Sequence, residues 1–140
     1  MAATPKHSVS VAGIVVRDDG RVLVIKRDDN GHWEAPGGVL ELDESFEAGV
    51  QREVLEETGL TVTVEGLTGV YKNLTHGIVA LVYRCRPAGG EPHATEEARE
   101  ICWMTTEEVQ SAMVPAFAAR VLDAFEAAPQ SRAHNGVDLV

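Results

Sequence analysis

The sequence predicts a single α/β or α+β domain with a mixed β-sheet and helices on both sides of it. Segments rich in β-branched residues come before, between and after segments with helical patterns, so both hairpin and crossover connections are needed. The 140 residues suit one domain, and 44% hydrophobic residues let it bury a core. We expect the domain to span residues 8–127, between a flexible N-terminus at residues 1–7 and a C-terminal tail at residues 128–140.

Residues 8–40 predict strands separated by turns. The segments Ser8–Arg17 and Arg21–Arg27 are rich in β-branched and other aliphatic residues, which favour strands. An Asp-Asp-Gly turn signal stands between them, so we expect the two strands to form a hairpin. Residues 33–40 contain a proline and two glycines and predict a loop or a distorted strand.

A helix is predicted at residues 44–58. Asp43 or Ser45 can cap its N-terminus, and Gly59 follows it, where helices commonly end in the left-handed conformation. Four strands are expected beyond this helix, at Leu60–Val64, Leu67–Tyr71, Ile78–Arg86 and Arg99–Met104.

Two shorter helices are predicted near the C-terminus. A Thr-Thr-Glu-Glu run has capping-box spacing and opens a helix from Thr105 to about Met113. The chain from Pro129 onward is polar, and we expect it to fray. Pro115 suits the first turn of the second helix, whose apolar face carries Phe117, Val121 and Phe125.

The net charge of −10 argues against nucleic-acid polymers and anionic membranes as partners, because both attract basic surfaces. A metal ion would have to supply positive charge before such a chain could bind polyphosphate. Residues 1–7 contain no apolar run, so we expect no secretory signal. The two cysteines, Cys85 and Cys102, have no metal-binding spacing, which favours a cytoplasmic protein with reduced thiols.

More than half of the excess negative charge lies in residues 41–60. Within this segment Glu53, Glu56 and Glu57 have the i, i+3, i+4 spacing that puts three carboxylates on one face of a helix. Their repulsion destabilises an isolated helix, whereas a hard divalent cation such as Mg²⁺ would offset it. The spacing therefore predicts a metal site.

Two neighbouring residues have roles that the sequence leaves open. Arg52 can reach Glu44 or Glu56 and hold one carboxylate in place. Gly49 lies one turn before Glu53, where glycine costs about 1 kcal/mol relative to alanine. It either leaves room for a metal or the backbone to approach, or packs against a neighbouring loop.

The segment resembles the Nudix box, whose pattern is Gly-x5-Glu-x7-Arg-Glu-U-x-Glu-Glu-x-Gly-U with U apolar. Val54 and Leu60 fill the apolar positions, and Trp-Glu-Ala-Pro-Gly-Gly before the box resembles the lead-in of MutT-like members. The fixed positions are all filled, by Gly38, Glu44, Arg52, Glu53, Glu56, Glu57 and Gly59.

The resemblance implies an α/β/α sandwich around a mixed sheet and a Mg²⁺- or Mn²⁺-dependent hydrolase of nucleoside diphosphates linked to a group X. It implies that Arg52 orients a glutamate and that turnover depends on Glu53 and Glu57. Glu53 is the first candidate for the base, with Glu97 or Glu100 as the alternative. The metal ligands implied are the carboxylates of Glu53, Glu56 and Glu57 and the carbonyl of Gly37.

Candidate substrate contacts come from residues outside the box. Arg27 is expected to contact phosphate, or else to be a solvated strand end. Trp33 and Tyr71 are expected to stack on a base, or else to pack in the core or at its rim. His76 is a candidate substrate contact or second base, or else an exposed loop residue.

The substrate expected from family habits is a nucleoside triphosphate, normal or oxidised, because the lead-in and downstream signatures of other Nudix subfamilies are missing. An ADP-ribose or nucleotide-sugar pyrophosphatase is the alternative enzyme. A nucleotide-binding module without turnover is the alternative outside enzymes, and it is disfavoured because no box glutamate is missing. The sequence leaves open whether the protein is a monomer or a homodimer.

Overall fold

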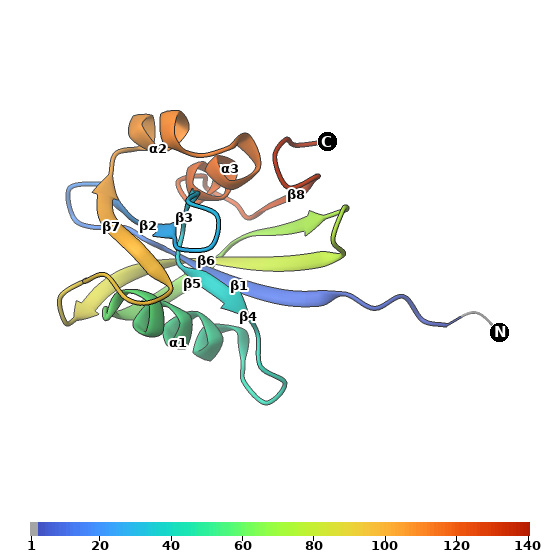
Figure 1. Cartoon of the computed structure of the whole chain (residues 1–140), viewed down its shortest axis with the longest axis horizontal. Helices are drawn as coiled ribbons and strands as arrows, with labels where there is room; N and C mark the ends of the chain where they lie inside the picture. The colour runs from blue at the N-terminus through green and yellow to red at the C-terminus, as the bar shows by residue number, and fades with distance from the viewer. Residues whose placement is uncertain (1–2) are drawn as a thin grey trace.

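The computed structural model describes residues 3–140 and arranges them in three layers (Figure 1). Helix α1 (Phe46–Thr58) lies on one side of the β-layer. Helices α2 (Thr106–Ala112) and α3 (Pro115–Asp123) lie on the other side. The predicted class, a mixed sheet with helices on both sides, is therefore confirmed. Among the described residues, no helix combines the length and apolarity needed to span a membrane.

The β-layer consists of two sheets, with strand orders β4-β1-β6-β5-β8 and β3-β2-β7. The first sheet is mixed, because β1 pairs antiparallel with β4 and parallel with β6. The second sheet is antiparallel. The strands are β1 (Ser8–Val15), β2 (Val22–Arg27), β3 (Trp33–Glu34), β4 (Gly37–Val39), β5 (Thr61–Asn73), β6 (Ile78–Gly89), β7 (Ala98–Met104) and β8 (Gln130–His134).

The predicted hairpin of the first two strands is wrong. β1 and β2 meet at the isolated bridge between Val16 and Val22, and each then pairs in a different sheet. The turn itself forms as expected, since the Arg17 N–H donates to the Arg21 carbonyl. β1 finds its partners in segments far along the chain, which local turn signals do not report.

Two further elements differ from the prediction. The two strands expected at residues 60–71 are one strand, β5, whose pairing with β6 continues through register shifts near Val64 and Leu67. The polar segment after Pro129 does not fray, because β8 pairs in parallel with β5. His134 at its end is fully buried.

Each side of the β-layer has its own hydrophobic core. Val50 and Val54 of α1 pack against one face, together with side chains of β1 and β6. Val109 of α2 and Val121 of α3 pack against the other face. Helix α1 is thus fixed by burial along one stripe, and its acidic residues lie beside that stripe.

The ends of α1 form as the sequence predicts. Of the two candidate caps, Ser45 is the one used, and its hydroxyl accepts a hydrogen bond from the Ala48 N–H at 3.1 Å. Gly59 ends the helix in the left-handed conformation, with φ of 77°. These caps set where α1 begins and ends, whereas the buried stripe of Val50 and Val54 sets which of its carboxylates face β4.

Candidate active site

Three carboxylates from two segments meet beside strand β4. Oxygen atoms of Glu53, Glu57 and Glu97 all lie within 4.8 Å of one another. Glu53 and Glu57 belong to α1 and are buried, whereas Glu97 is exposed in the loop before β7. The prediction that the first two share a helix face is confirmed, and the fold adds Glu97 to them.

The glycines of β4 let the carboxylates approach the backbone. The Gly37 N–H donates to Oε1 of Glu57 at 2.7 Å. A Cβ added to Gly38 would lie 2.6 Å from the Glu53 carboxylate carbon, so a larger residue would displace that side chain. The carbonyl of Gly37 as a metal ligand stays a prediction.

Arg52 holds the glutamates from the solvent side. Its guanidinium donates to Oε2 of Glu44 at 2.9 Å, to Oε1 of Glu53 at 2.7 Å and to Oε2 of Glu56 at 3.3 Å. It also donates to the Val39 carbonyl at 3.2 Å. Both contacts suggested by the sequence are present, and a third, to Glu53, joins Arg52 to the carboxylate cluster.

Glu56 lies outside the cluster of three, although the box pattern placed it among the metal ligands. Its side chain is 51% exposed and pairs with Arg52. Glu100, the alternative base, also lies elsewhere and pairs with Lys26 at 3.4 Å. Glu97 is therefore the residue of that loop that the structure brings to the box.

Burial makes the clustered carboxylates costly to ionise. Desolvation raises the pKa of Glu57 to about 8, reinforced by Glu53 and Glu97 and opposed by the Gly37 N–H. Desolvation also raises the pKa of Glu53, against the effect of Arg52. A hard divalent cation would bind the oxygens of all three carboxylates. Its positive charge would offset the cost of ionising Glu53 and Glu57.

Gly49 has a structural explanation. A Cβ at this position would lie 2.7 Å from Cδ1 of Leu40 and 3.0 Å from Oε1 of Glu44, both in the loop that leads into α1. Of the two roles suggested by the sequence, packing against a neighbouring loop is therefore the one observed.

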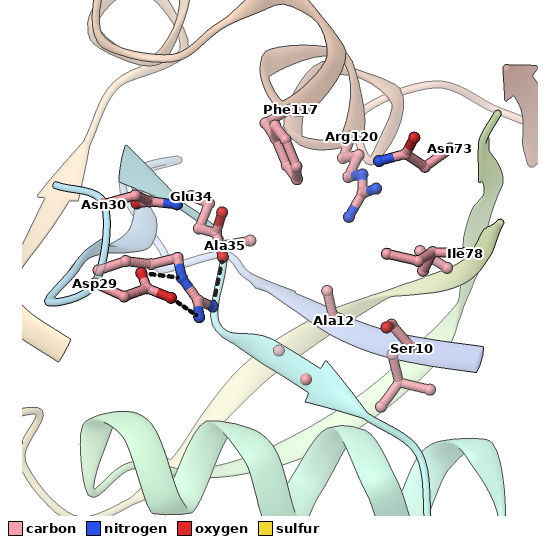
Figure 2. Close-up of a pocket in the computed structure, with 15 residues that line it drawn as sticks. Ser10, Ala12, Asp29, Asn30, Glu34, Ala35, Asn73, Ile78, Phe117 and Arg120 are labelled. Carbon is pink, nitrogen blue, oxygen red and sulfur yellow. Dashed lines mark hydrogen bonds and ion pairs between the residues drawn. The ribbon is translucent and has the colours of Figure 1, made fainter. Parts of the chain in front are cut away.

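A cavity of about 290 Å³ adjoins the carboxylates on the other side of β4 (Figure 2). Gly37 and Gly38 line it and also touch Glu57 and Glu53, so the backbone of β4 is common to the cavity and the acidic cluster. The other lining residues come from β1, from residues 27–35, from the facing ends of β5 and β6 and from α3; they include Ser10, Ala12, Arg27, Asp29, Glu34, Asn73, Ile78, Phe117 and Arg120.

The three residues predicted to contact substrate lie in three different places: the cavity, a second hollow and the core. Arg27 lines the cavity, where it pairs with Asp29 at 2.8 Å and with Glu34 at 3.1 Å (Figure 2). Trp33 lines a separate, smaller hollow with Phe117. Of the two roles expected for Tyr71, packing in the core is the one observed, because its side chain is fully buried; stacking on a base is ruled out.

His76 is exposed and does not line the cavity, in agreement with its reading as a loop residue.

Sequence reasoning missed the cavity residues outside the box, chiefly Asn73, Phe117 and Arg120. One signal was present for the last of these. Arg120 follows Phe117 by three residues, which places an arginine on the apolar face of its helix. Asn73 gave no such signal.

Comparisons with known proteins define the class. The model of the NUDIX domain family matches residues 6–125. A MutT-like protein of Streptomyces ambofaciens is 58% identical over 137 residues, which cover 97% of this chain and 89% of that protein. The chain therefore belongs to the Nudix hydrolase family, and the resemblance seen in its sequence is confirmed.

More distant relatives differ in the substrate that they are named for. An ADP-ribose pyrophosphatase of Methanocaldococcus jannaschii is 37% identical over 100 residues, 66% of this chain and 59% of that protein. A putative 8-oxo-dGTP diphosphatase of Mycobacterium tuberculosis is 36% identical over 110 residues, 74% and 77% of the two chains. Among solved structures, a MutT NUDIX hydrolase of Burkholderia pseudomallei has a TM-score of 0.76 at 26% identity, covering 85% of this chain and 98% of that one.

Proposed function

We propose that this Nudix hydrolase is a Mg²⁺- or Mn²⁺-dependent pyrophosphohydrolase of nucleoside triphosphates, normal or oxidised. The observation that carries the proposal is the shared wall of the site. The backbone of Gly37 and Gly38 has the carboxylate cluster on one side and the cavity on the other. A nucleotide with its base in the cavity would therefore place its phosphates beside the carboxylates.

The residues that would hold the cation are Glu53, Glu57 and Glu97. A divalent cation bound there would neutralise phosphate charge and lower the pKa of the attacking water. Oε1 of Glu53 is held by Arg52, which fixes the orientation of the carboxylate. Glu53 or Glu97 then takes the proton from the attacking water on a carboxylate oxygen. Glu56, whose exposed carboxylate pairs with Arg52, and the Gly37 carbonyl stay candidates for further ligands of the same cation.

Two observations support a nucleoside triphosphate as substrate. A relative that is 36% identical over 110 residues is named as a putative 8-oxo-dGTP diphosphatase. The cavity, at about 290 Å³, lies at the lower end of the range of roughly 300–1,000 Å³ typical of small-molecule pockets. This volume suits the base of a nucleotide whose phosphates lie outside the cavity, beside the carboxylates.

The proposal is tested with a panel of nucleoside triphosphates, deoxynucleoside triphosphates, 8-oxo-dGTP, ADP-ribose and a nucleotide sugar. Each is incubated with Mg²⁺ and with Mn²⁺, and phosphate and pyrophosphate release are followed. We expect the highest kcat/KM with a triphosphate and release of pyrophosphate. A higher kcat/KM with ADP-ribose would contradict the substrate class, and binding without turnover of any compound would contradict the hydrolytic role.

A further inference from the structure

Arg120 of α3 extends into the cavity without a partner that accepts its hydrogen bonds (Figure 2). Its Nε is buried and has no hydrogen-bond partner. Its guanidinium carbon lies 4.6 Å from the ring centre of Phe117 and 5.3 Å from that of Tyr71, so the group makes cation–π contacts with both rings. Within residues 3–140, Arg120 belongs to none of the ion pairs.

One polar group, His134, does contact the guanidinium of Arg120: its Nε2 lies 3.3 Å from Nη2. The other ring nitrogen, Nδ1, accepts a hydrogen bond from the Gly136 N–H at 2.9 Å. A backbone N–H only donates, so Nδ1 carries a lone pair and the proton of the neutral ring is on Nε2. Nε2 and Nη2 are then both donors. His134 therefore leaves the hydrogen-bond donors of Arg120 without an acceptor.

Asn73 adds a second donor to the same end of the cavity. Its Oδ1 accepts hydrogen bonds from the backbone N–H groups of Thr75 at 3.0 Å and His76 at 3.2 Å. These two contacts fix which amide atom is oxygen and leave Nδ2 on the side of Arg120, as Figure 2 shows. An unpaired buried donor is costly, as Nε of Arg120 is, and Nδ2 of Asn73 adds a second N–H to the same end of the cavity; the two residues together favour a ligand that brings acceptors.

The charges of the cavity indicate that this ligand group is neutral. Arg27 and Arg120 are balanced by Asp29 and Glu34, and Arg27 is already paired with both carboxylates. An anionic group at Arg120 would also face the field of Glu34. A neutral keto oxygen meets the free donors without adding charge, and Oε2 of Glu34, the oxygen that is not paired with Arg27, can accept an N–H from the same base.

We propose that Arg120 and Asn73 select substrates whose base carries a keto oxygen, as guanine, cytosine and uracil do, over adenine, which has none. The proposal rests on the proposed function and deepens it. The fork of Arg120 suits a pair of adjacent acceptors, which guanine offers at N7 and O6 and cytosine at N3 and O2, whereas uracil offers one keto oxygen at a time; arginine discriminates bases in this way elsewhere. Phe117 closes this end of the cavity as an apolar wall.

The test is the ratio of kcat/KM for GTP and for CTP to that for ATP, in wild type and in Arg120→Met. We expect wild type to favour GTP or CTP, and the variant to lose roughly tenfold or more of that preference. Arg120→Lys keeps the charge but lacks the planar fork, so it should recover only part of the ratio.

Arg84→Met is the matched control. Arg84 also lies over an aromatic ring, 5.1 Å from the centre of Phe125, and donates to the Ala124 carbonyl at 3.0 Å, but it does not line the cavity. Its loss should leave the ratio unchanged. An unchanged ratio in a folded Arg120→Met protein would overturn the proposal, as would a wild-type preference for ATP.

Binding of the monophosphates GMP, CMP and AMP gives the same ratio without turnover. If no nucleotide were hydrolysed but Arg120→Met still lowered the preference for GMP over AMP, the proposed function would fail and the selecting role of Arg120 would stand. If triphosphates were hydrolysed but neither ratio changed, the selecting role alone would fail.

Discussion

Arg52 and Arg120 lie on opposite sides of the site and differ in what surrounds their guanidinium groups. Arg52 donates to three glutamates and a backbone carbonyl. Arg120 contacts two aromatic rings and faces a histidine nitrogen that is itself a donor. Acceptor-rich surroundings make an arginine part of the scaffold, whereas surroundings without acceptors leave its hydrogen bonds for a ligand.

The largest expected effect tests the cluster that Arg52 supports. Glu53→Gln and Glu57→Gln keep the size of each side chain but remove a charge that would hold the cation, so we expect kcat to fall by about 100-fold or more. Turnover of the best substrate at saturating Mg²⁺ measures this. Glu56→Gln is the matched control with a smaller expected loss, because its carboxylate lies outside the cluster. An equal loss in all three variants would place Glu56 among the ligands.

The two arginines themselves should respond in opposite directions to the same change. Arg52→Met frees Glu44 and Glu53 from their partner, so we expect a lower Tm and a loss of roughly tenfold to a hundredfold in kcat. Arg120→Met replaces an unsatisfied charge with an apolar chain, so we expect a Tm no lower than that of wild type. Thermal unfolding without nucleotide compares them. A marked loss of Tm in Arg120→Met would show that Arg120 also belongs to the scaffold.

The stability of the metal-free protein should depend on pH through Glu57. The pKa of its carboxyl is raised from 4.5 in the unfolded chain to about 8 in the fold. Its stabilising effect is therefore fully present below pH 4.5 and is lost as pH rises through 8. In the presence of a chelator, we expect the Tm to fall over this window by more in wild type than in Glu57→Gln. Adding Mg²⁺ should restore most stability at the alkaline end, and equal slopes for the two proteins would contradict the assignment.

The smallest expected effect concerns Tyr71, behind Arg120. Its hydroxyl donates to Oδ2 of Asp123 at 2.8 Å, and Arg132 holds the same carboxylate at 2.7 and 2.8 Å. Tyr71→Phe keeps the ring and removes one hydrogen bond, so we expect a loss of about 1 kcal/mol in the free energy of unfolding. Urea denaturation measures this loss. A rise in KM without loss of stability would return Tyr71 to the substrate contacts that its sequence suggested.

The carboxylates of the box were predictable because they are local. The spacing of Glu53 and Glu57 decides their common face once the helix exists, and Ser45 and Gly59 define that helix. Glu97 followed from the resemblance alone, because a loop 40 residues away reaches the box only through the pairing of β7 with β2.

The prediction failed where pairing or packing is long-range. The partners of β1 are β4 and β6, and β8 contains no apolar alternation and owes its place to pairing with β5. Tyr71 and Arg120 show the same limit for side chains. An aromatic residue in a strand gives no sign that it is buried in the core, and the place of Arg120 on the apolar face of its helix does not say that its guanidinium reaches a cavity.

The parallel pairing of β8 has a consequence for redesigning the protein. Residues 37–57 supply most of the acidic cluster, while Phe117 and Arg120 of α3 line the cavity and His134 of β8 contacts Arg120. None of the three clustered carboxylates lines the cavity. A library of variants confined to residues 117–136 can therefore alter which base is accepted while leaving the hydrolytic residues as they are.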